Sequence, residues 1–121
     1  MERNVLGKPI ETCSCEPMTG FFRDGSCRTC EDDVGKHTVC VELTAEFLAF
    51  SRSRGNDLST PVPEYSFPGL KEGDKWCLCA DRWLEAYENN CAPKVYLLST
   101  NSEILKKIPL NLLKPFAVDL D

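Results

Sequence analysis

Residues 76–83 read WCLCADRW, and within this stretch the hydrophobic pattern changes from that of a strand to that of a helix. Residues 75–79 (KWCLC) have the length and composition of a buried strand. From residue 80 onward apolar side chains recur at i, i+3, i+4 and i+7, namely Ala80, Trp83, Leu84 and Tyr87. This change of period predicts a strand that runs directly into an amphipathic helix.

The segment before this stretch predicts a second strand and a second helix. Residues 38–43 alternate between apolar and polar side chains, which indicates a strand with one apolar face. Thr44 is a typical N-cap, and Gly55 is a typical helix end. A helix is therefore expected between them.

The segment after residues 76–83 predicts one more strand. Residues 94–99 (KVYLLS) have a strand composition, and a strand, helix and strand in this order favour parallel first and last strands. Thr100 and Glu103 have the spacing of a capping box for a short helix, and a last turn is expected around residues 110–113.

These elements define the fold class. Residues 1–35 show no regular period and are interrupted by prolines and glycines, so they are expected to be irregular. The sequence predicts an α+β or α/β fold formed as one compact two-layer sandwich. A small sheet carries helices on one side, and a single domain covers residues 1–121.

Charge and composition exclude several classes of partner. The net charge is −5 with no basic block, which argues against nucleic acid and anionic membranes. No apolar run is long enough to span a bilayer, and the first residues lack the apolar stretch of a secretory signal. We therefore expect a cytoplasmic protein with reduced thiols and a fold that does not depend on disulfides. A protein or a small molecule remains as the class of partner.

The eight cysteines and one histidine suggest a metal site. They form close pairs in sequence, namely Cys13 with Cys15, Cys27 with Cys30, His37 with Cys40, and Cys77 with Cys79. Zinc favours four such sulfur and nitrogen ligands. The predicted zinc ligands are Cys77, Cys79, Cys40 and His37, with Cys13 or Cys27 as substitutes. The alternative is that the cysteines are inert and fill the core.

A thiol enzyme is a second interpretation of the same residues. Cys79 directly precedes the predicted helix at residue 80, where the positive end of the helix dipole favours a thiolate. The catalytic candidates are Cys79 or Cys77 as nucleophile and His37 as base. The sequence names no third residue that would orient the histidine, so it leaves open whether the protein is an enzyme.

The long segment at residues 56–74 (NDLSTPVPEYSFPGLKEGD) predicts a loop that could bind a ligand. The candidate binding residues at its start are polar, namely Arg54, Asn56, Asp57, Ser59 and Thr60. Side chains of these types also satisfy the backbone of local turns, which is the alternative role.

Several phrases together resemble a known family, namely NVLG, CSCEPMTGFFRDG, HTVC, SRGNDLSTPVPEYSFPGLKEGDKWCLCADRW and IPLNLLKPFAV. The chain is similar over nearly its whole length to the family catalogued as domain of unknown function 2237. The resemblance implies a compact two-layer α/β domain and brings no established activity. It also implies that Cys13, Cys27, Cys40, Cys77 and Cys79 stand at cysteine positions of the family, whereas Cys15, Cys30 and Cys91 do not.

The sequence thus favours a small cytosolic binding domain that uses a cysteine-rich sheet face and the adjoining polar loop. The sequence leaves open whether the bound species is a metal ion such as zinc, a thiol-reactive small molecule or another protein. One alternative is a thiol-dependent enzyme with a cysteine and histidine pair. The other is a protein-interaction module in which the cysteines are purely structural.

Overall fold

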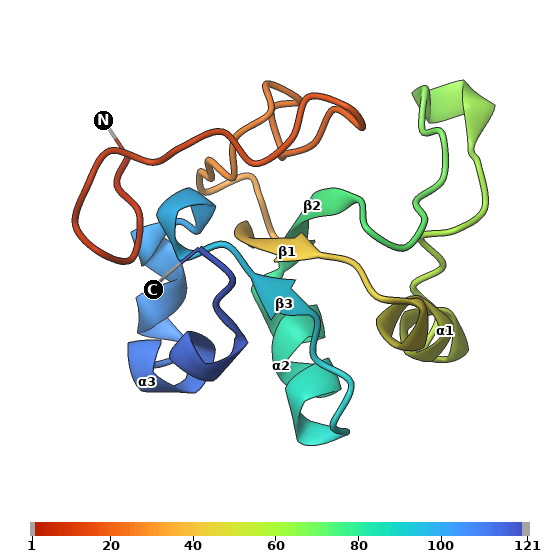
Figure 1. The fold of residues 1–121 in the computed structure, drawn as a ribbon. Coiled ribbons are helices and arrows are strands. Elements are labelled where there is room, and N and C mark those ends of the chain that lie inside the picture. Colours follow the sequence, from red (N-terminus) through yellow and green to blue (C-terminus); the bar gives the residue numbers. More distant parts are fainter. Residues whose placement is uncertain (1, 120–121) are drawn as a thin grey trace.

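A three-stranded antiparallel sheet forms the centre of the computed structural model, which describes residues 2–119 (Figure 1). The strands are β1 (His37–Glu42), β2 (Lys75–Cys79) and β3 (Lys94–Val95), in the order β2-β1-β3. Both β2 and β3 are antiparallel to β1, so they point in the same direction as predicted, with β1 between them.

Three α-helices accompany the sheet: α1 (Ala45–Ser53), α2 (Ala80–Glu88) and α3 (Leu110–Leu113). Short 3₁₀ helices lie at Pro63–Tyr65, Leu97–Ser99, Ser102–Lys106 and Lys114–Phe116. The predicted N-cap is confirmed, because the Thr44 hydroxyl accepts a hydrogen bond of 3.0 Å from the Phe47 amide. Gly55, just beyond α1, has a φ of +86°, a left-handed conformation that glycine adopts without steric cost.

The sheet separates two kinds of packing (Figure 1). Helix α2 lies against one face, and the irregular N-terminal segment lies on the opposite side of the sheet. The main apolar core includes Val39 and Leu78 of the sheet and Trp83 of α2, all at most 1% exposed. The result is the compact α+β fold that the sequence predicts.

Two details of the last third of the chain differ from the prediction. The third strand ends at Val95, and a 3₁₀ helix at Leu97–Ser99 follows it. The next helix is capped by Asn101, whose side chain accepts from the Glu103 amide at 2.9 Å. Thr100 instead donates its hydroxyl to the Tyr96 carbonyl, so the predicted capping box is wrong by one residue.

The expectation of free thiols throughout the chain is also wrong. Cys13 is bonded to Cys40, and Cys27 is bonded to Cys77. Each bond fastens the N-terminal segment to one strand of the sheet, because Cys40 lies on β1 and Cys77 on β2. Cysteines that are not disulfide bonded are Cys15, Cys30, Cys79 and Cys91.

Within residues 2–119, no helix combines the length and the apolar character needed to cross a membrane.

Candidate functional site

Cys79 and His37 lie side by side at the end of the sheet. They occupy paired positions of β2 and β1, so their side chains project from the same face. A Cβ atom at Gly35 would lie 3.0 Å from the Cys79 sulfur and 3.1 Å from Cε1 of His37. Both side chains therefore meet over the Gly35 backbone, where a larger residue would crowd them.

Asp33 orients the His37 ring from the side opposite Cys79. Its Oδ1 accepts a hydrogen bond of 2.7 Å from Nδ1 of His37, and its Oδ2 accepts from the His37 backbone amide at 2.9 Å. The Asp33 side chain is fully buried, whereas the His37 side chain is 36% exposed. With Nδ1 bound to the carboxylate, Nε2 is the ring nitrogen left to face Cys79. Asp33, His37 and Cys79 are called the thiol site below.

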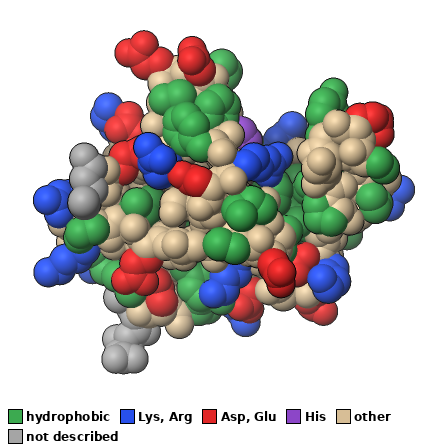
Figure 2. Space-filling model, turned by 90° about the horizontal axis from the view of Figure 1, so that it is seen from above, with side chains coloured by type: hydrophobic (Ala, Val, Ile, Leu, Met, Phe, Trp, Pro, Cys, Tyr) green, Lys and Arg blue, Asp and Glu red, His purple; other side chains and the backbone are tan. Residues whose placement is uncertain are grey.

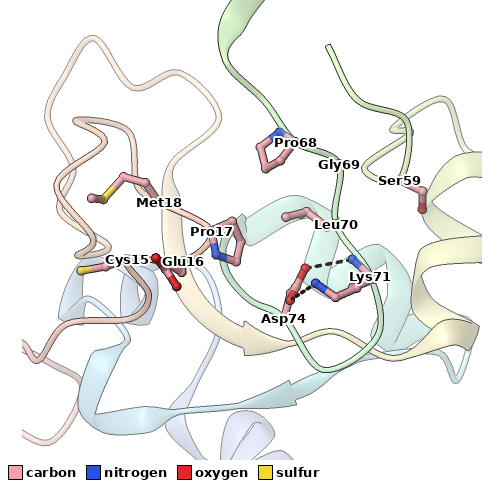
Figure 3. A pocket seen from close by; sticks show the side chains of 10 residues that line it. All are labelled: Cys15, Glu16, Pro17, Met18, Ser59, Pro68, Gly69, Leu70, Lys71 and Asp74. Carbon is pink, nitrogen blue, oxygen red and sulfur yellow. Dashed lines mark hydrogen bonds and ion pairs between the residues drawn. The ribbon is translucent and has the colours of Figure 1, made fainter. Parts of the chain in front are cut away.

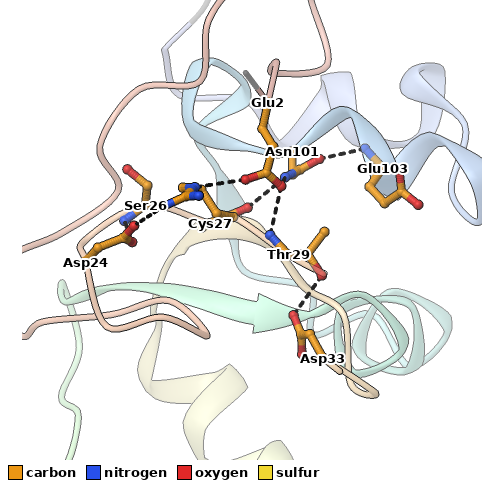
Figure 4. Close-up of polar contacts among 9 residues, drawn as sticks. Glu2, Asp24, Ser26, Cys27, Thr29, Asp33, Asn101 and Glu103 are labelled. Carbon is orange, nitrogen blue, oxygen red and sulfur yellow. Dashed lines mark hydrogen bonds and ion pairs between the residues drawn. The ribbon is translucent and has the colours of Figure 1, made fainter. Parts of the chain in front are cut away.

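A network of hydrogen bonds fixes the position of the Asp33 carboxylate (Figure 4). The Thr29 hydroxyl donates to Oδ2 of Asp33 at 2.9 Å, and the Thr29 amide donates to the Glu2 carboxylate at 2.9 Å. The same oxygen of Glu2 accepts from the Asn101 side chain, which also donates to the Cys27 carbonyl at 3.0 Å. Segments far apart in the sequence thus hold the carboxylate in one orientation.

The charges of the thiol site stabilise one another. The hydrogen bond with the Cys79 side chain is the largest cause that raises the pKa of His37 from 6.5 to about 9, while burial opposes the rise and Asp33 adds to it. Burial raises the pKa of Asp33, but hydrogen bonds from His37 and Thr29 outweigh it and hold this pKa below 3.8. These interactions favour a protonated His37 imidazole beside the Asp33 carboxylate.

Cys79 lies at the N-terminal end of helix α2. Cys79 is the N-cap of α2, with extended backbone angles, and its side chain makes no capping hydrogen bond. A residue at this place lies near the positive end of the helix dipole. The Ala80 amide donates to the Lys36 carbonyl at 3.1 Å, which fastens the helix start to the loop before His37.

A cavity of about 120 Å³ opens beside the His37 ring and is lined by Gly20, Phe21, Arg23, His37, Trp76 and Cys77. The Arg23 guanidinium lies 5.1 Å from the centre of the Trp76 ring, and Arg23 forms no ion pair within residues 2–119. Figure 2 shows part of the imidazole beside a hydrophobic protrusion, with cationic side chains near it. A small anionic group would fit this environment.

The thiol of Cys15 has different surroundings. It lines an open groove of about 650 Å³ between the N-terminal segment and residues 68–74, which Figure 3 shows. The groove is lined by no imidazole, and its lysine, Lys71, is paired with Asp74 at 3.3 Å. Cys15 is exposed and therefore provides an internal reference for an ordinary thiol.

The structure brings together part of the predicted zinc set. His37 and Cys79 are neighbours, but Cys40 and Cys77 are disulfide bonded and offer no thiolate while oxidised. The substitutes Cys13 and Cys27 are the disulfide partners of Cys40 and Cys77. These four cysteines form a buried cluster of their own on the sheet.

Several polar residues of the predicted binding loop form hydrogen bonds or ion pairs within the protein. Asp57 accepts hydrogen bonds from the Ser59 and Thr60 amides and from the Thr60 hydroxyl. The Arg54 guanidinium lies 3.8 Å from the Glu85 carboxylate. The Asn56 backbone carbonyl accepts a hydrogen bond of 2.7 Å from the Ser51 hydroxyl. A ligand for these residues stays a prediction.

Sequence reasoning missed Asp33, which lies in the irregular stretch DDVGKH before β1. The sequence signal that could have revealed Asp33 was its position four residues before the single histidine.

The fold and the thiol site define a small α+β protein in which a histidine, oriented by a buried aspartate, contacts a cysteine at a helix N-terminus. The chain belongs to the family described as "Uncharacterized protein conserved in bacteria (DUF2237)", whose family model matches residues 3–117. This match confirms the resemblance seen in the sequence. A search of curated proteins gives no match.

Proposed function

We propose that the protein is a thiol-dependent enzyme in which Cys79 is the nucleophile, His37 transfers the proton and Asp33 positions His37. The observation that carries this proposal is the continuous order of carboxylate, imidazole and sulfur, with 2.7 Å between Asp33 Oδ1 and His37 Nδ1. A nucleophile, a base within reach and a group that orients the base are the elements of an activated nucleophile.

The chemistry that this order supports best is acyl transfer. The Cys79 thiolate would add to a carbonyl carbon, and the Nε2 proton of His37 would pass to the leaving group as its bond to that carbon breaks. The products of this step are a thioester on Cys79, a neutral imidazole and the protonated leaving group. Water would then attack the thioester with His37 as base, which releases the acid and restores the ion pair.

A pure binding role ranks second because the predicted ligands are committed elsewhere. Cys40 and Cys77 are in disulfides, and Asp57 is used by the turn that it caps. The cytoplasmic location predicted from the sequence remains a prediction.

Alkylation by iodoacetamide tests the nucleophile. In the oxidised protein at neutral pH, we expect Cys79 to be alkylated at least about 10-fold faster than Cys15, although Cys15 is the more exposed. Peptide mapping by mass spectrometry after short exposures measures both rates in one sample. Equal rates, or a faster Cys15, would remove the proposal.

Variants distinguish activation of the Cys79 thiol by His37 from the accessibility of that thiol to the reagent. His37→Asn is expected to slow alkylation of Cys79 by about 10-fold or more and to leave Cys15 unchanged, because only Cys79 contacts the imidazole. Exposure to p-nitrophenyl acetate should place an acetyl group on Cys79 in the native protein but not in Cys79→Ser. An acetyl group found first on another residue would contradict the acyl-transfer chemistry.

A further inference from the structure

Four buried cysteines meet on the face of the sheet that the N-terminal segment covers. Cys13, Cys27, Cys40 and Cys77 are between 0% and 4% exposed, and the apolar side chains packed against them are Ile10 and Tyr96. The sulfur atoms of Cys13, Cys27 and Cys77 lie within 4.8 Å of one another, and the Cys40 sulfur is bonded to that of Cys13. We call these four residues the cysteine layer.

The two disulfides are close enough to share one ion when reduced. Zinc bound by four thiolates has bonds of about 2.3 Å, which places neighbouring sulfurs roughly 3.8 Å apart in a tetrahedron. The Cys13 sulfur already lies within 4.8 Å of the Cys27 and Cys77 sulfurs, which are bonded to each other. Cys40 and Cys77 occupy paired positions on β1 and β2, and each is linked to a cysteine of the N-terminal segment.

Hydrogen bonds that do not involve sulfur hold the backbone at all four positions. The Cys77 amide donates to the Thr19 hydroxyl at 2.8 Å, and the Cys40 amide donates to the Thr100 hydroxyl at 3.2 Å. The Cys27 carbonyl accepts from Asn101, and the Cys13 amide donates to the Gly25 carbonyl at 2.7 Å. Reduction would therefore leave four thiols close together and partly preorganised.

We propose that the reduced protein binds one zinc ion through Cys13, Cys27, Cys40 and Cys77, so that the cysteine layer exists either as two disulfides or as a zinc tetrathiolate. Two molecules of an external dithiol reduce the two disulfides, each supplying two electrons and two protons and becoming a disulfide itself. Zinc then replaces the four thiol protons, which are released to solvent. Buried thiolates in such a closed set make a structural site rather than a catalytic one.

This ligand set differs from the one that the sequence predicts, because it leaves out Cys79 and His37. The thiol site would keep its own residues in both states of the cysteine layer. Zinc binding and Cys79 reactivity can therefore fail separately.

Reconstitution tests the proposal. The chain is unfolded and reduced with a phosphine, refolded with one equivalent of Zn²⁺ or without metal, and passed over a desalting column under inert gas. We expect about one zinc per reduced chain by elemental analysis and none on the oxidised chain. Cobalt in place of zinc should give the absorption of a tetrahedral thiolate site.

Matched variants identify the ligands. Replacement of Cys15, Cys30 and Cys91 together by serine, or of Cys79 alone, should leave the zinc content unchanged. Cys13→Ser and Cys27→Ser should each weaken binding at least about 10-fold in competition with a chromogenic chelator, with refolding followed by circular dichroism.

The following results would overturn the proposal of a zinc site in the cysteine layer. A reduced chain that folds without taking up zinc excludes the site, and so does a reduced chain that neither folds nor binds zinc when the metal is supplied. Loss of zinc in Cys79→Ser or His37→Asn would assign the ion to a different ligand set.

Discussion

Cys77 and Cys79 are two residues apart on the same strand, yet their surroundings differ. Cys77 is 1% exposed and bonded to Cys27, whereas Cys79 is a partly exposed thiol at the start of α2. The N-terminal segment makes the difference, because it supplies Cys27 as the disulfide partner of Cys77, whereas the residue paired with Cys79 is His37 of β1. The state of each cysteine on this sheet therefore depends on residues that are distant in sequence more than on the spacing between the two cysteines.

The largest effect that sharpens this comparison should come from the Cys27 to Cys77 disulfide. Its removal in Cys27→Ala/Cys77→Ala is expected to lower the free energy of unfolding by about 4 kcal/mol, because the disulfide closes a loop over a sequence separation of 50 residues. Cys79→Ala should cost less than about 1 kcal/mol, since that side chain is partly exposed. Denaturant unfolding under oxidising conditions measures both. A similar cost for the two variants would contradict the division of roles.

The next effect concerns the other face of the same strand. Leu78 lies between the two cysteines and is 1% exposed in the apolar core. Leu78→Ala is expected to cost about 3 kcal/mol of stability through the cavity that it leaves. The alkylation rate of Cys79 in the folded variant should stay within a few-fold of the native rate. If Leu78→Ala folds normally but its Cys79 is alkylated much more slowly, the apolar face and the cysteine face of β2 are not independent.

The charge state of His37 gives a third test. Nuclear magnetic resonance should show a His37 pKa of about 9, and Cys79→Ser should lower it more than Asp33→Asn, because the Cys79 hydrogen bond is the largest cause of the rise. The raised pKa stabilises the folded chain fully below pH 6.5, and this contribution is lost as the pH rises through about 9. A native pKa near 6.5 would show that the ion pair does not form.

The smallest effect should come from Arg23, beside the thiol site. Arg23→Gln is expected to slow alkylation of Cys79 by anionic iodoacetate about 3-fold while leaving alkylation by neutral iodoacetamide unchanged, because the guanidinium lines the cavity next to His37. Arg52→Gln, on α1, is the matched control that should alter neither rate. Equal slowing with both reagents would indicate a change of structure rather than of charge.

Local patterns predicted the framework of the fold better than its cross-links. The bounds of β2 and the Thr44 cap followed from the period of apolar residues and from capping chemistry, both of which act over a few residues. The cap at residues 100 and 101 was misassigned because threonine and asparagine share that chemistry. The error stayed small because the neighbouring helix still forms.

The candidate site was only partly predictable for a different reason. The pairing of Cys79 with His37 could be proposed because Cys79 directly precedes the predicted helix and His37 is the single histidine of the sequence. Asp33 and the disulfide partners Cys13 and Cys27 lie in the irregular N-terminal segment, whose course over the sheet no periodicity encodes. The expectation of free thiols came from the assumed compartment, which is not a property of the fold.

The hydrogen bond from the Cys77 amide to the Thr19 hydroxyl also covers part of an edge of the sheet. Strand β2 is at the edge of the sheet, and an uncovered edge is a template for pairing with a strand of another molecule. Thr19 occupies one outward amide of that edge, and the Cys27 to Cys77 bond keeps the covering segment in place. A chain with neither disulfides nor metal in the cysteine layer would hold the covering segment by hydrogen bonds alone, so this edge would open more readily and aggregation would become more frequent.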